Sequence, residues 1–125
     1  MAVKILLLAL AGALGAVARY GCTTIAQRAF SPDFPWGTMI VNMMGCFIVG
    51  LFWSLAEEKI TISPELRVII LVGFLGAFTT FSTFIFETGS LMREASWTPA
   101  IMNILTHNAA GILLLLVGIR IGRSF

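Results

Sequence analysis

Long apolar blocks most constrain what this chain can fold into. Of its 125 residues, 58% are hydrophobic and 11% are charged, and the mean hydropathy is +0.98. A soluble domain carries about a quarter charged residues. Since a helix needs about 20 apolar residues to cross a bilayer, the sequence predicts an all-α membrane protein with one domain over residues 1–125. We expect spans at about residues 3–26, 36–55, 66–91 and 99–119.

The first span begins like a secretory signal, with Lys4, an apolar run and a small-residue site at 16–18. Against cleavage, the apolar segment continues to Ala26. Gly12 and Ala16 also have the small-xxx-small spacing that suits close helix contact in membranes. We therefore expect an uncleaved helix, with a cleaved signal as the alternative.

Basic residues divide almost evenly between the two ends of the predicted spans, and lysine and arginine placement sets orientation. We therefore expect insertion in both orientations; a single orientation set by the small excess is the alternative. The end that carries the termini has Lys4, Lys59, Arg67, Arg120 and Arg123, and the other end has Arg19, Arg28 and Arg93.

Motifs for catalysis, metal binding and nucleic-acid binding are missing from the sequence. There is no Ser-His-Asp arrangement, GxSxG or Walker A motif. Cys22 and Cys46 form no CxxC pair and are expected to be small buried hydrophobes. His107 is expected to bond within its helix or to line a pore. The net charge of +2, without a basic run, argues against nucleic acid. The chain is not expected to be an enzyme.

The deep polar residues are almost all uncharged hydrogen-bond donors. Glu87 is the one acid within a span that a coupled transporter could use, and its position near a loop favours an interfacial location. A donor-rich, uncharged interior suits a small anion. The donors are Asn42, Thr79, Thr80, Ser82, Thr83, Thr106 and Asn108.

The segment 73–86 combines phenylalanines, hydroxyls and two glycines inside the third span. At helical spacing Phe74, Phe78, Phe81 and either Phe84 or Ile85 fall on one stripe. One interpretation is a helix-packing surface, because small and hydroxyl residues join membrane helices. The other is an ion site, in which ring edges face an anion and a break in the helix frees carbonyls for a cation.

Three segments resemble signatures of the Fluc (CrcB) family of fluoride channels. They are GALGAVARY at 12–20, GT with Asn42 and Gly45 at 37–45, and GFLGAFTTFSTF at 73–84. Their order and the four-span length match over essentially the whole chain. The resemblance implies a multi-pass protein of the bacterial inner membrane that exports fluoride passively.

The resemblance also implies an antiparallel, dual-topology homodimer in membrane lipid, with the third helix broken mid-membrane. A structural sodium ion (Na+) at the dimer interface would be held by the carbonyls of Gly76 and Thr79. Phe81 and Phe84 would line the fluoride pores by their ring edges, and Asn42 would donate a hydrogen bond to the ion. Thr80, Ser82 and Thr83 would belong to the same pore region.

Two roles stay open in this comparison. Arg19 is expected either at an aqueous vestibule, favouring anion entry, or as an interfacial arginine that extends toward the headgroups. The fourth span departs from the hydroxyls expected in relatives. Its polar residues, any of which is a candidate for contact with fluoride, are Asn103, Thr106, His107 and Asn108.

Two other functions are compatible with four spans. A small multidrug-type, cation-coupled exporter should carry a deep glutamate in its first span, and this span has no acid. A non-conducting structural membrane subunit would need no ion path. A fluoride-selective channel remains the predicted function.

Overall fold

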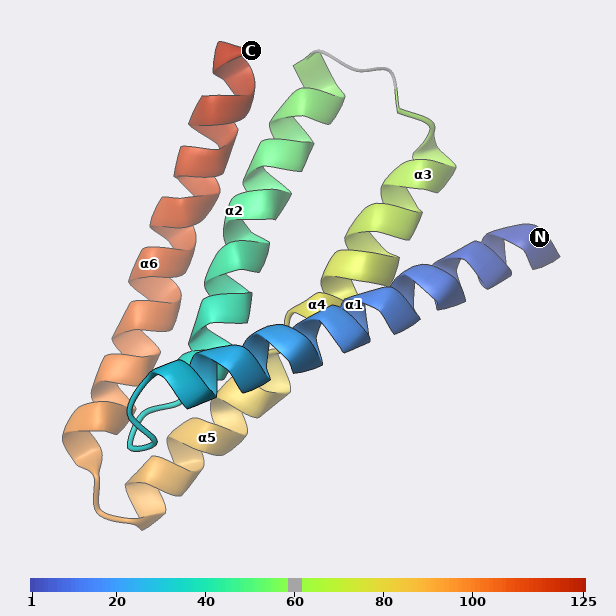
Figure 1. Cartoon of the computed structure of the whole chain (residues 1–125). Helices are drawn as coiled ribbons and strands as arrows, with labels where there is room; N and C mark the ends of the chain where they lie inside the picture. Colours follow the sequence, from blue (N-terminus) through green and yellow to red (C-terminus); the bar gives the residue numbers. More distant parts are fainter. Residues whose placement is uncertain (59–61) are drawn as a thin grey trace.

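The third membrane segment of this all-helical chain is divided, whereas the other three are continuous helices. The computed structural model describes residues 1–58 and 62–125, and every regular element within these ranges is helical. Four segments of the described residues are long and apolar enough to cross a membrane, which confirms the predicted all-helical chain with four spans. The helices are α1 Ala2–Ala29, α2 Trp36–Glu58, α3 Pro64–Val68, the π-helix η1 Ile69–Leu75, α4 Gly76–Phe78, α5 Phe81–Arg93 and α6 Trp97–Ser124 (Figure 1).

The helices extend beyond the predicted spans at most of their ends. α1 runs to Ala29 rather than about residue 26, α2 to residue 58 rather than 55, and α6 begins at Trp97 rather than Pro99. The apolar pattern marks only the part of a helix that suits hydrocarbon, and charged or polar turns continue the helix beyond it. Pro99 is tolerated because the amides of the first helical turn have no partner within the helix.

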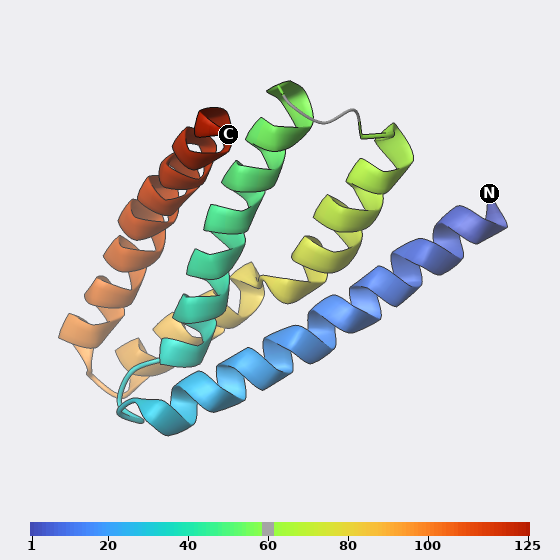
Figure 2. The ribbon, with the colours of Figure 1, turned by 45° about the horizontal axis from the view of Figure 1, so that its top comes forward.

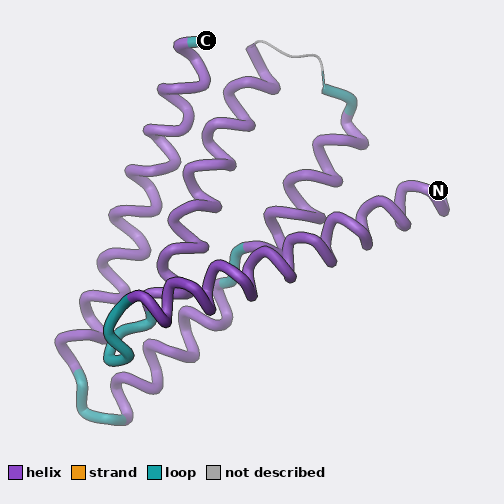
Figure 3. The backbone as a smooth tube through the Cα atoms, viewed as in Figure 1, coloured by secondary structure: helices purple, strands orange, loops and turns teal. Residues whose placement is uncertain are grey.

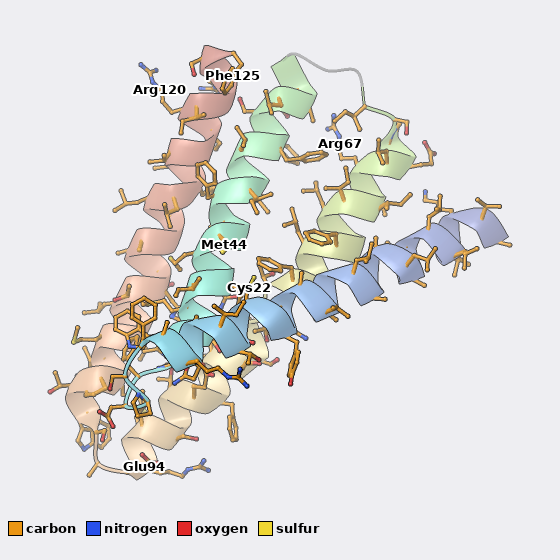
Figure 4. All side chains as sticks on the ribbon, viewed as in Figure 1. Cys22, Met44, Arg67, Glu94, Arg120 and Phe125 are labelled. Atoms are coloured by element: carbon orange, nitrogen blue, oxygen red, sulfur yellow. The ribbon has the colours of Figure 1, made fainter. Side chains whose placement is uncertain are left out.

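Both chain termini lie at the same end of the helices (Figures 1 and 2). Arg67, Arg120 and Phe125 lie toward this end, and Glu94 lies at the opposite end (Figure 4). Arg67 and Arg120 therefore lie at the end of the helices to which the sequence assigned them. Lys59, which the sequence assigned to the same end, lies outside the described residues.

Helix α2 packs along α6, and the two run side by side in both views (Figures 1 and 2). The close approach depends on glycines of α6. A Cβ at Gly118 would overlap the carbonyl of Phe47, and one at Gly122 would lie 2.8 Å from the Cβ of Ser54. Such small residues let backbones meet where no water drives helices together.

Helix α1 crosses the third segment, which is its principal packing partner (Figure 2). A Cβ at Gly15 would overlap the carbonyl of Phe74, so this glycine sets the contact. The buried cluster beside it consists of Val41, Leu75 and Phe78. α1 therefore supports the third segment at the point where that segment is divided.

The third segment begins with a capped helix and is interrupted at residues 79 and 80. Ser63 accepts a hydrogen bond from the amide of Leu66 (3.2 Å), and Pro64 opens α3. Thr79 (φ −90°, ψ 162°) and Thr80 (φ −152°, ψ 118°) are extended, so helical geometry stops after α4 and resumes in α5. The tube view shows this loop between two helical stretches inside the molecule (Figure 3).

Candidate functional site

A cavity of about 340 Å³ lies at the break in the third segment. It brings together residues from α2, the break, α5 and α6. Within the described part of the chain, its lining has no Asp, Glu, Lys or Arg. The lining residues are Asn42, Gly45, Cys46, Val49, Thr79, Thr80, Phe81, Phe84, His107, Asn108 and Leu115.

Asn42 and Thr80 are joined by hydrogen bonds in both directions. The Asn42 Nδ2 donates to the Thr80 carbonyl (2.9 Å), and the Thr80 amide donates to Asn42 Oδ1 (2.8 Å). In an unbroken α-helix that amide would bond to the carbonyl of Gly76. Asn42 Oδ1 therefore replaces the Gly76 carbonyl as acceptor for the Thr80 amide, and Asn42 also satisfies the Thr80 carbonyl. The second N–H of its Nδ2 has no partner among the described residues, and Asn42 lines the cavity.

The Thr80 hydroxyl supplies a second replacement, because it caps α5. It accepts from the amide of Thr83 (3.3 Å), which a continuous helix would give to the carbonyl of Thr79. It also contacts the hydroxyls of Thr83 (2.9 Å) and Ser82 (3.4 Å). Ser82 and Thr83 are exposed and lie outside the cavity lining. Thr80, Ser82 and Thr83 are therefore in contact with one another, but of these three only Thr80 lines the cavity.

The carbonyl oxygens of Gly76 and Thr79 could serve as ligands of a cation. In a continuous helix they would accept from the amides of Thr80 and Thr83, but those amides donate instead to Asn42 Oδ1 and to the Thr80 hydroxyl. Of the donors in the described residues, Arg19 Nη1 reaches the Thr79 carbonyl at 3.4 Å. The guanidinium thus extends toward the break from α1, and Arg19 does not line the larger cavity near the loops.

Gly45 makes room for the break on the side of α2. A Cβ at this position would overlap the Cγ2 methyl of Thr79. The Thr79 hydroxyl meanwhile donates to the carbonyl of Leu75 (2.9 Å), so its side chain is held in place. Gly45 therefore permits the close approach of α2 to the break at residues 79 and 80.

The phenylalanines form two pairs rather than the predicted single stripe. Phe74 and Phe78 stack with centroids 5.9 Å apart, whereas Phe81 and Phe84 lie 5.6 Å apart with planes tilted by 52°. The single-stripe prediction is wrong because the extended residues at 79 and 80 interrupt the helical repeat. Phe84 is 5% exposed, but Phe81 is 73% exposed in the single chain.

The polar residues of α6 divide into two groups. His107 and Asn108 line the cavity, while Thr106 and Asn103 do not. The His107 ring lies 4.3 Å from the Phe84 ring, between centroids. Asn103 is fully buried and donates to the Thr88 hydroxyl (2.9 Å), which in turn donates to the Phe84 carbonyl (2.7 Å).

Glu87 lies in a second cavity of about 520 Å³, between α1, α2 and α5. Thr38 donates its hydroxyl to Glu87 Oε1 (2.7 Å), and Oε2 is buried. The sequence suggested an interfacial carboxylate but not this bond. Neither Thr38 nor Cys46 was expected at a cavity. These positions were only partly indicated by the sequence. Thr38 follows Gly37 and Cys46 follows Gly45, the two glycines of the 37–45 segment.

Comparison with known proteins identifies the family of this chain. Residues 6–119 match the family described as CrcB-like protein, Camphor Resistance (CrcB). A protein of Desulforapulum autotrophicum named fluoride-specific ion channel FluC is 48% identical over 120 residues, which is 96% of each chain. Proteins of the same name from Nitrosococcus oceani (42%, 96% of each chain) and Nitratidesulfovibrio vulgaris strain Miyazaki F (48%, 96% of this chain and 97% of the relative) match over the same length. With this match over nearly its whole length, the chain belongs to the CrcB family.

Proposed function

We propose that this protein is a fluoride-selective ion channel that lowers cytoplasmic fluoride by passive export across the bacterial inner membrane. One observation carries the proposal. The cavity at the helix break combines a donor amide, a hydroxyl and two phenylalanine rings with no charged side chain among its described lining residues. The relatives named fluoride-specific ion channel FluC support the same ion. The protein is therefore a transporter and not an enzyme.

The chemistry of the cavity suits a small, strongly hydrated anion. A narrow pore must replace lost water with several donors at once. Asn42 keeps one N–H beyond its bond to Thr80, and the edges of Phe81 and Phe84 carry partial positive charge. With no charged side chain in the described lining, no ion pair with the lining holds the anion there, which suits conduction.

The exposure of Phe81 supports assembly of two copies into an antiparallel homodimer. A large ring that is 73% exposed beside the cavity leaves the ion path open on one side in a single chain. A second copy in the opposite orientation would close it and repeat the path. The nearly even division of basic residues supports insertion in both orientations.

A sodium ion at the interface of the two copies is the proposed cofactor. Gly76 and Thr79 would hold it by their carbonyls, together with the same atoms of the second copy. Their amide partners are taken by Asn42 and by the Thr80 hydroxyl. When bound, the ion supplies positive charge that offsets the cost of bringing an anion to the same depth.

Fluoride efflux from liposomes that contain only the purified protein tests the channel. We expect fast, electrogenic, fluoride-selective efflux that persists without a pH gradient. Efflux no faster than from empty vesicles, with the dimer intact, would refute the proposal. A non-conducting subunit predicts that result, and a cation-coupled exporter predicts that efflux depends on a proton or cation gradient.

Phe81→Ile and Phe84→Ile test the rings separately. Each should suppress fluoride efflux and leave a folded dimer, because isoleucine has no ring edge. Phe125→Ile is the matched control, since Phe125 is also highly exposed (81%) but lies at the chain end, away from the cavity. Unchanged efflux in both pore variants would remove the rings from the mechanism.

Reporter fusions at the C-terminus test dual insertion. Two reporters, each active on only one side of the membrane, should both give a signal. Signal from one reporter alone would show a single orientation and contradict the antiparallel dimer.

A further inference from the structure

His107 contributes the one imidazole of the chain to the cavity at the helix break. Its ring lies against Phe84, with centroids 4.3 Å apart and planes inclined by 32°. Phe84 is the buried member of the proposed pore pair. The imidazole therefore lies beside the space through which the ion would pass.

The backbone determines which nitrogen of His107 carries the proton. Nδ1 lies 3.0 Å from the carbonyl oxygen of Asn103, one turn earlier in α6. A carbonyl can only accept, so Nδ1 must donate and the neutral ring has its proton there. Nε2 then has a bare lone pair. It is buried and has no hydrogen-bond partner within the described part of the chain.

From this geometry we propose that His107 determines fluoride conduction through the protonation of Nε2. The inference rests on the proposed channel function. In the neutral ring Nε2, which has no partner among the described residues, places a lone pair beside the path, and a lone pair opposes an anion. When Nε2 takes one proton from water, the same atom becomes a cationic N–H donor, and charge-assisted hydrogen bonds to anions are stronger than neutral ones. Acid then adds an anion subsite beside Phe84.

Few other groups in the surroundings are charged or can titrate. On α2, Cys46 lines the same cavity, and a thiol is neutral in acid. On α5, Glu87 accepts from Thr38 and lines the other cavity. On α1, Arg19 keeps its charge and reaches the Thr79 carbonyl. On α6 itself, the cavity lining adds only Asn108 and Leu115. Among these groups of the described residues, Glu87 is therefore the rival source of an acid response.

Electrical recording tests the proposal, because neutral HF crosses lipid without carrying current. Fluoride current through the reconstituted protein is measured at about pH 7.5 and about pH 5.5, on either side of the range in which histidine ordinarily titrates. We expect the current to rise roughly threefold to tenfold in acid, as a charge-assisted donor replaces a lone pair. His107→Gln should give the same current at both pH values, and Glu87→Gln should keep the rise.

The contrary outcomes separate the two proposals. A fluoride current that stays level or falls on acidification would overturn the role of His107 and leave the channel standing. A rise that survives in His107→Gln but disappears in Glu87→Gln would do the same. Absence of current at both pH values would remove the channel function, and this role with it.

A spectroscopic measurement needs no variant. Because the chain has a single histidine, nitrogen NMR of protein labelled with ¹⁵N-histidine reports this ring alone. At about pH 8 the spectrum should show the tautomer with the proton on Nδ1, and in acid Nε2 should become protonated and its signal should move on addition of fluoride. The tautomer with the proton on Nε2 at high pH would overturn the proposal.

Discussion

Asn42 and Thr80 close a ring of two hydrogen bonds between α2 and the break in the third segment. The Asn42 side chain thereby serves as both donor and acceptor for the backbone of Thr80, which is extended and not helical. In a membrane, each such group without a partner costs several kcal/mol, since no water replaces the bond. An amide side chain carries a donor and an acceptor, so this one residue satisfies both groups.

Replacing Asn42 by alanine should therefore destabilise the fold as well as the ion path. We expect Asn42→Ala to lower the free energy of unfolding by at least about 2 kcal/mol, because it leaves the amide and the carbonyl of Thr80 without partners and each such group costs about 1–3 kcal/mol or more. Unfolding in mixed micelles measures this change. Asn108→Ala is the control for stability, because Asn108 bonds only to the carbonyl of Ile104 in its own helix. Equal stability of the two variants would contradict the bridging role.

Gly45 and Thr79 should show strong coupling in a double-mutant cycle. Gly45→Ala places a methyl group where the Cγ2 of Thr79 lies, and overpacking of this kind costs about 1–3 kcal/mol. Thr79→Ser removes that methyl group and keeps the hydroxyl that bonds to Leu75. We expect the double variant to regain most of the stability that Gly45→Ala loses. Additive effects would show that the two residues do not compete for space.

The membrane spans could be predicted because hydropathy reports the solvent around a helix. The same pattern could not give the helix ends, as α1 shows by continuing through Arg28 to Ala29. A polar residue can lie outside the hydrocarbon region of the membrane and still belong to the helix. The glycines at 15 and 45 were visible as small residues, but their partners, the Phe74 carbonyl and the Thr79 methyl, are set by the crossing of helices.

The candidate site shows the same division. The donors of the cavity could be expected from composition, and Asn42, Phe81 and Phe84 from the resemblance. The second role of Asn42, as a substitute for helical bonding, depends on an extended geometry at Thr79 and Thr80 that side-chain patterns do not encode. The tautomer of His107 likewise depends on one carbonyl in three dimensions.

Thr88 and Asn103 should reveal the cost of a half-satisfied polar pair. Asn103 is fully buried, its Nδ2 donates to the Thr88 hydroxyl, and its Oδ1 has no partner among the described residues. Thr88→Val keeps the shape and should lower the free energy of unfolding by about 1–3 kcal/mol, because the Asn103 amide loses its acceptor.

The double variant Thr88→Val with Asn103→Leu should recover part of that loss, since removal of both partners leaves no unsatisfied group. Thr88→Ser is the conservative control and keeps the hydroxyl. The same unfolding assay measures all three. A double variant less stable than Thr88→Val alone would indicate that the pair is needed for packing rather than for mutual satisfaction.

Salt dependence should decide between the two roles of Arg19. Its guanidinium reaches the Thr79 carbonyl, close to the cavity, so its charge can raise the local concentration of fluoride. We expect Arg19→Gln to reduce fluoride current roughly threefold to tenfold at ~0.01 M salt and much less at ~1 M, where the Debye length falls from about 30 Å to about 3 Å. Arg19→Lys should retain most of the current. Loss that is equal at both salt concentrations would point instead to support of the Thr79 carbonyl, and no loss at either would assign Arg19 to the membrane interface.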